Sequence, residues 1–84
     1  MKGPQYYDSL PWEVEIEPDV RADGSTYYVA RHPEFGEVSG PLGTGASPEE
    51  ALAKLKEARW SLIQVLLERG DPIPEPRSVR SAVT

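Results

Sequence analysis

The residues best suited to chemistry are acidic side chains that alternate along one short stretch of the chain. Glu13, Glu15 and Glu17 are spaced by two, and Asp19 and Asp23 continue the acidic run. Alternate side chains of a strand share one face and stand about 6.5–7 Å apart. Two-metal nucleases and glycosidases need carboxylates that converge in a cleft. A row along one exposed face does not converge, so we interpret it as a solvated strand face, without a catalytic or metal site.

A histidine and a glycine-rich stretch are the other candidates for chemistry. His32 is the only histidine, it lies beside Pro33, and the chain has no cysteine to share a metal with it. A surface turn residue is therefore favoured over a general base. Residues 40–45 lead into a helix start, where backbone amides can hold a phosphate. They lack the P-loop lysine, so we expect a loop with positive φ angles, no cofactor and no enzyme activity.

Length and composition limit the class of protein. The 84 residues, without cysteine, predict one cytoplasmic domain over 1–84 with no disulfide. We expect an N-terminal arm over 1–10, a core over 11–76 and a frayed tail over 77–84. No apolar run approaches the length of a membrane span. A chain of this size buries only about 60–65% of its unfolded surface, which favours an oligomer or a bound partner.

Charge is unevenly divided along the chain. Residues 1–50 carry ten acidic and three basic side chains, whereas residues 51–84 carry four acidic and six basic ones. The acidic half would repel phosphate backbones, and glutamates interrupt the basic residues of the second half, so direct nucleic-acid binding is not expected. The same acidic half would attract a basic partner protein. Solubility is the alternative reason for such a surface.

The first half of the chain has the signals of a β-meander. Every second residue is apolar from Trp12 to Ile16, which predicts a half-buried strand that Pro18 ends. A second, antiparallel strand is predicted over 26–31 and a short third strand over 35–39. With the helix that follows, the sequence predicts an α+β fold in which a three-stranded antiparallel meander precedes one long helix packed on the sheet.

That helix has clear end signals. Ser47 is a favourable N-cap, Pro48 suits the first helical position, and Glu50 completes a capping box. Gly70 is placed to end the helix, which we expect over 48–69. One apolar stripe has the helical period and should cover the sheet. It comprises Ala51, Leu55, Ala58, Leu62, Val65 and Leu66.

A second apolar stripe of the helix comprises Trp60, Ile63 and Leu67. One sheet face cannot bury both stripes. Either the N-terminal arm or the tail covers the second stripe, or the stripe meets another subunit. We favour a homo-oligomer, a dimer or a tetramer, with these three residues at its interface. Edge pairing by the third strand is the alternative geometry.

Four segments occur in a recognisable order: Tyr27–Ala30, the turn Pro33–Gly36, the helix start Gly45–Ala51 and the exit Glu68–Pro76. Together they resemble the HicB antitoxin family over about residues 12–76. The resemblance implies a partial ribonuclease H-like β-β-β-α fold, with a possible short C-terminal strand and no nuclease activity. It also implies that the chain neutralises a small basic HicA-like toxin, which cleaves messenger RNA. The acidic residues Glu13, Glu15, Glu17, Asp19 and Asp23 would then form the toxin-binding surface.

Two features depart from the family pattern. Many HicB antitoxins continue into a DNA-binding domain, which the 84 residues do not contain, so autorepression is not expected. Gly36-Glu37 stands where the family usually has Gly-Cys. The alternative to an antitoxin is a stand-alone homo-oligomeric scaffold or regulatory protein without a toxin partner.

Overall fold

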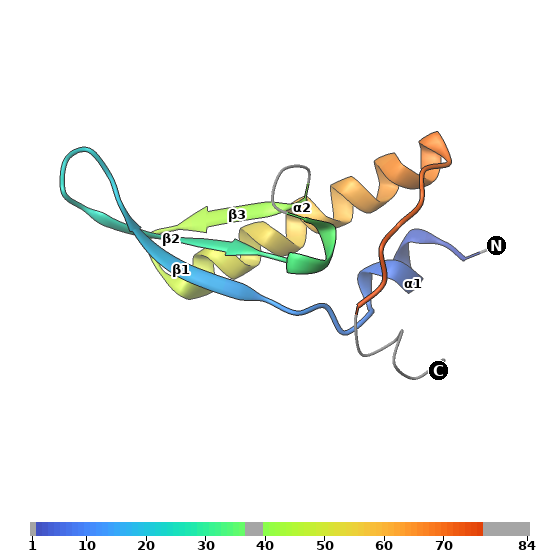
Figure 1. Cartoon of the computed structure of the whole chain (residues 1–84), viewed down its shortest axis with the longest axis horizontal. Coiled ribbons are helices and arrows are strands. Elements are labelled where there is room, and N and C mark those ends of the chain that lie inside the picture. Colours follow the sequence, from blue (N-terminus) through green and yellow to red (C-terminus); the bar gives the residue numbers. More distant parts are fainter. Residues whose placement is uncertain (1, 37–39, 77–84) are drawn as a thin grey trace.

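The computed structural model describes residues 2–36 and 40–76, which form a sheet and a long helix in two layers (Figure 1). In chain order the elements are α1 (Pro4–Asp8), β1 (Glu15–Val20), β2 (Thr26–Arg31), the 3-10 turn η1 (Pro33–Phe35), β3 (Leu42–Gly45) and α2 (Pro48–Arg69). The strands are antiparallel in the order β1-β2-β3, and α2 packs on one face. The predicted α+β meander followed by a long helix is confirmed. The predicted C-terminal strand and frayed tail, residues 77–84, lie outside the described residues.

β1 runs through Pro18 instead of ending there. In the register of the hairpin, Pro18 lies opposite Tyr28. Proline lacks the N–H that a central strand donates, but an edge strand has one side without a partner and tolerates it. β1 is such an edge, because its only neighbour in the described sheet is β2. The prediction that Pro18 ends the strand was therefore wrong, whereas β2 has its predicted bounds.

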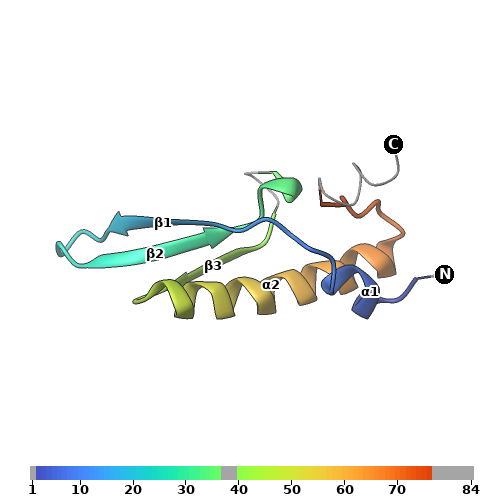
Figure 2. The same ribbon diagram turned by 90° about the horizontal axis from the view of Figure 1, so that it is seen from below.

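α2 does not cover the sheet evenly. It lies mainly against β3 and then β2, and β1 is the strand farthest from it (Figure 2). Trp12, the first residue of the predicted buried face, is buried, but all six residues of β1 are exposed, so the prediction of a half-buried strand was wrong for β1 itself. The hairpin of β1 and β2 also projects beyond the beginning of α2 (Figures 1 and 2). The apolar side chains of β1 consequently remain in contact with solvent.

The third strand of the described sheet lies at Leu42–Gly45, after the predicted range 35–39. Phe35 belongs to η1, and residues 37–39 lie outside the described part of the chain. Sequence signals missed β3 because two of its four residues are glycines, which are depleted in strands. Neither of these glycines has a positive φ, so the predicted glycine loop was also wrong.

Close packing explains the glycines of β3. A Cβ atom at Gly43 would collide with the backbone of Ala51 and Leu55 in α2. A Cβ atom at Gly45 would lie 2.6 Å from the Glu50 side chain. Glycine therefore lets the helix backbone rest directly on the strand, and this contact decides where α2 sits on the sheet.

α2 has the predicted bounds and caps. The Ser47 hydroxyl accepts a hydrogen bond from the Glu50 N–H at 3.1 Å, as predicted for the N-cap. The Glu50 carboxylate accepts from the Ala46 N–H at 3.4 Å, one residue before the Ser47 N–H expected of a capping box. At the other end Gly70 adopts a φ of 72°, and the Asp71 N–H donates to the Leu66 carbonyl at 3.0 Å. This is a Schellman-type end, which satisfies carbonyls that the helix itself leaves free.

The buried stripe of α2 winds around the helix. Ala51, Leu55 and Ile63 are fully buried, and the Arg59 side chain between them is only 12% exposed. These four residues are spaced by four, and each such step advances about 40° around a helix. The stripe therefore begins against the sheet and ends on the side of α1. Val65, predicted to face the sheet, is 43% exposed.

Both ends of the described chain pack on the second half of α2. The sequence predicted only an arm before residue 11, but residues 4–8 form α1, which lies against α2 (Figure 1). After α2, residues 71–76 run back past the second half of the helix, and Pro76 is fully buried. Within the described residues, no helix combines the length and apolar character needed to cross a membrane.

Candidate protein-binding surface

The sheet face opposite α2 is not covered by any described element. Directly opposed residues of an antiparallel pair share a face, and Ala30, packed on Ala51 and Leu55, marks the face that α2 covers. We call the other side the open sheet face. It carries Glu15, Glu17 and Asp19 from β1, Tyr27, Val29 and Arg31 from β2, and Leu42 and Thr44 from β3.

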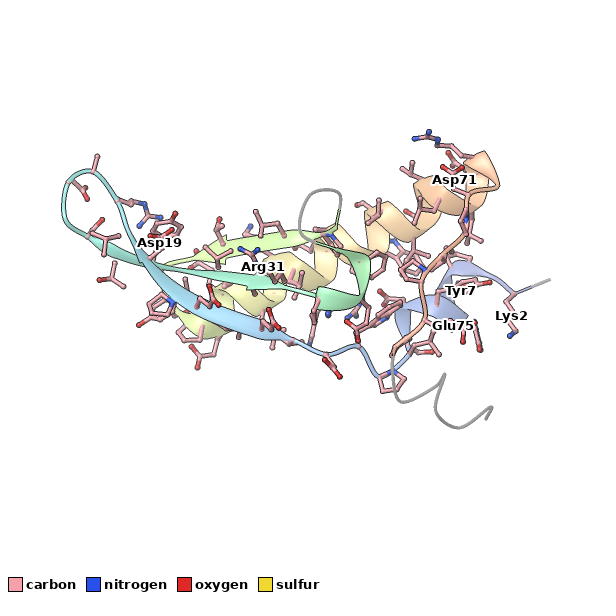
Figure 3. The ribbon with its side chains drawn as sticks, in the orientation of Figure 1. Lys2, Tyr7, Asp19, Arg31, Asp71 and Glu75 are labelled. Atoms are coloured by element: carbon pink, nitrogen blue, oxygen red, sulfur yellow. The ribbon has the colours of Figure 1, made fainter. Side chains whose placement is uncertain are left out.

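Three carboxylates line the outer strand of the open sheet face. Glu15 lies opposite Arg31, and Glu17 lies opposite the apolar Val29. At the end nearest the turn, the Tyr27 hydroxyl donates to Asp19 Oδ2 at 3.1 Å, and this bond raises the pKa of the Tyr27 hydroxyl. Asp19 and Arg31 are labelled in Figure 3. The face has an acidic margin beside apolar and aromatic side chains, a combination suited to binding a basic protein surface.

The other two predicted binding residues lie outside β1. Glu13 precedes the strand, where its N–H donates to Glu34 Oε2 at 2.9 Å. Asp23 lies in the hairpin turn, and its Oδ1 accepts from the Ser25 N–H at 2.9 Å and the Ser25 hydroxyl at 2.7 Å. These bonds lower the pKa of the Asp23 carboxyl, whose first role is to shape the turn. The structure therefore brings three of the five predicted residues together on one face.

The lone histidine is buried and is not a surface turn residue. His32 is 1% exposed, its Nδ1 lies 2.6 Å from the Glu13 carbonyl oxygen, and its Nε2 lies 3.1 Å from Arg59 Nη1. A carbonyl only accepts and a guanidinium only donates, so the ring must be neutral with its proton on Nδ1. Burial lowers the pKa of His32, and the bond to the Glu13 carbonyl partly opposes this shift. The ring has no access to a substrate, which argues against general-base chemistry.

Arg59 connects the histidine to the N-terminal segment. Its Nε donates to Asp8 Oδ1 at 2.8 Å, so one guanidinium bridges α1, α2 and the end of β2. Beside this cluster the Trp12 indole donates to the Tyr7 carbonyl at 2.9 Å, and its ring lies 4.7 Å from that of Phe35 between centroids. The sequence missed this anchor. The sequence feature that could have indicated it is Arg59 itself, a charged residue four positions from each of the apolar residues Leu55 and Ile63.

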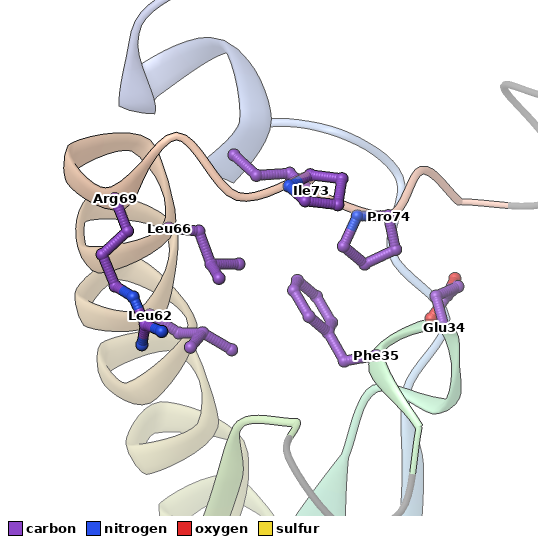
Figure 4. A pocket seen from close by; sticks show the side chains of 8 residues that line it. Glu34, Phe35, Leu62, Leu66, Arg69, Ile73 and Pro74 are labelled. Atoms are coloured by element: carbon purple, nitrogen blue, oxygen red, sulfur yellow. The ribbon is translucent and has the colours of Figure 1, made fainter.

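A pocket of about 530 Å³ lies between the second half of α2, η1 and residues 72–74 of the segment that follows α2 (Figure 4). Its lining comprises Glu34, Phe35, Leu62, Leu66, Arg69, Pro72, Ile73 and Pro74. The lining is mostly apolar; its ionisable side chains are Glu34 and Arg69, and it contains no histidine, hydroxyl or thiol. Among residues 2–36 and 40–76, no three histidine or acidic side chains come together as a metal site.

The predicted oligomer interface on α2 is partly covered by the chain itself. Ile63 is fully buried, and Trp60 and Leu67 are half-buried. α1 packs on α2, as expected if the N-terminal arm covers part of the second stripe. Ile63 is therefore not available to a second subunit in this fold.

Comparison with family models, curated proteins and solved structures found no match to this chain. Two features of the chain therefore bear on its function: the open sheet face, and the buried cluster of Asp8, His32 and Arg59. The first is accessible and carries exposed carboxylates. The second is largely buried and holds α1 in place. The open sheet face is thus a surface that another protein can reach.

Proposed function

We propose that the chain is an antitoxin-type protein-binding domain that neutralises a small basic HicA-like toxin by holding it against the open sheet face. The observation that carries the proposal is the exposed row of Glu15, Glu17 and Asp19 on a sheet face that no described element covers. The order of three antiparallel strands and a long helix agrees with what the HicB resemblance implies.

Recognition combines charge with apolar contact. Each exposed carboxylate contributes a few tenths to about 1 kcal/mol, and together they accelerate the encounter with a basic partner. Leu42, 51% exposed on the same face, and the half-buried Val29 supply apolar area beside the acidic margin. Bound there, the domain would cover the basic surface with which a ribonuclease holds its RNA.

The test first looks for a gene for a small basic protein beside this one, and the product of such a gene is the binding partner. We expect Glu15→Gln, Glu17→Gln and Asp19→Asn together to slow association several-fold at about 0.02 M salt and to matter little at about 0.5 M. The matched control removes three charges from the opposite side of the molecule, at the exposed α2 residues Glu49, Glu57 and Glu68. Equal effects of the two triple variants, or a neighbouring protein that does not bind, would contradict the proposal.

A stand-alone homo-oligomeric scaffold is the second candidate function. It is favoured by exposed apolar side chains at the two ends of β1, Val14 just before the strand at 42% and Val20 at 63%. A gene without a small basic neighbour, together with a stable oligomer of the purified chain, would favour this function over toxin binding.

A further inference from the structure

One side of β1, together with Val14 just before the strand, is apolar and yet exposed. Val14 is 42% exposed, Ile16 37% and Val20 63%, and Pro18 between them is also exposed. We call these four residues the β1 flank. Apolar side chains that alternate in this way are typical of a strand face packed against a hydrophobic core, but in this chain the face is exposed to solvent.

The register shows which way the β1 flank points. Ile16 lies opposite Ala30, and Pro18 lies opposite Tyr28. Ala30 is completely buried in the core with α2, and Tyr28 packs against the same core together with Leu52. The β1 flank therefore lies on the helix side of the sheet, beyond the edge of α2. It lies on the hairpin that projects beyond α2 (Figure 2), beside Tyr28 in the register of the sheet.

From these observations we infer that two copies of the chain associate through the β1 flank, each covering the other's. The intramolecular core is small, since the buried hydrophobic residues other than proline among those described are Trp12, Ala30, Ala51, Leu55 and Ile63. Small domains with so little core gain much of their stability from association. In a two-fold symmetric dimer the same surface of each copy forms the interface, so the β1 flank of one copy would cover the β1 flank of the other.

Charge favours a second copy on this side of β1 and not on the other. Glu15, Glu17 and Asp19 all point to the open sheet face, where two copies would repel each other. The β1 flank itself carries no charge. Association through the flank leaves the carboxylate row free, so this inference is independent of the proposed toxin binding.

The contact is face to face and not an extension of the sheet. Pro18, in the middle of β1, has no N–H to donate to a further strand, which blunts the edge for pairing. The six residues of β1 span about 20 Å, and the projecting hairpin presents this length clear of α2 (Figure 1).

The test measures the association of the purified full chain by sedimentation over a range of protein concentrations. We expect a dimer for the wild type and at least about tenfold weaker association for Val20→Glu, because a charge would be buried against the second copy. The matched control is Leu42→Glu, which places the same charge at an apolar residue of similar exposure, 51%, on the opposite sheet face. This control should associate like the wild type.

Circular dichroism checks that each variant keeps its fold, and the high exposure of Val20 makes unfolding by its substitution unexpected. A wild type that is monomeric at about 100 μM would overturn the inference. Equal association of Val20→Glu and Leu42→Glu would also overturn it, as would a dimer that only Trp60→Ala dissociates. A monomer whose toxin binding is lost in Val20→Glu would assign the β1 flank to the toxin instead.

Discussion

Replacing Arg59 by methionine removes the guanidinium that joins α1 to α2 and to His32 while keeping an apolar stem of similar length. Its partner Asp8 is 31% exposed in the side chain, so it regains part of its hydration, and the loss of this pair should cost about 1–2 kcal/mol. His32 Nε2, 3.1 Å from the lost donor, is left buried without a partner at a further cost of about 1–2 kcal/mol. We therefore expect Arg59→Met to lower the free energy of unfolding by about 3 kcal/mol.

Urea-induced unfolding, followed by tryptophan fluorescence and circular dichroism, measures this loss. In a domain of this size it corresponds to a fall in Tm of about 12–24 °C. The control is Arg69→Met, because Arg69 pairs with Asp71 at the surface, where the two side chains are 70% and 41% exposed. That pair should contribute less than about 0.5 kcal/mol. If Arg59→Met and Arg69→Met lowered the free energy of unfolding equally, the bonds of Arg59 to Asp8 and His32 would stabilise the fold no more than a surface ion pair, which would refute the prediction.

Stability should also depend on pH through His32, whose pKa is lowered in the folded chain, so the unfolded chain takes up the proton first as the pH falls. The free energy of unfolding should be at its maximum above about pH 7.5 and should fall below about pH 6.5 by at most about 1.4 kcal/mol per pH unit. Urea midpoints at several pH values measure this dependence. The same dependence on pH in His32→Asn would contradict the assignment to His32. Gly43→Ala should cost at least about 2 kcal/mol in thermal unfolding, because its Cβ meets helix backbone. Thr44→Ala, exposed on the same strand, should cost less than about 1 kcal/mol, and equal losses would argue against a tight helix–strand contact.

Local signals fixed the elements whose ends depend on their own residues. Ser47 and Gly70 set the bounds of α2 because capping bonds join residues only three to five positions apart. β2 was predicted with its full bounds because its β-branched and aromatic residues lie between turn signals. The acidic alternation likewise predicted which carboxylates share a face, since the period of a strand is two.

Only the tertiary structure decided which surfaces are covered. Pro18 is tolerated because β1 is an edge, and the β1 flank is exposed because α2 settles on the glycines of β3. His32 is buried and is bonded by Arg59, which lies 27 residues away in α2. Strand order and the seat of a helix depend on contacts between residues far apart in the chain, and the periodicity of one segment carries no information about the segment that will lie against it.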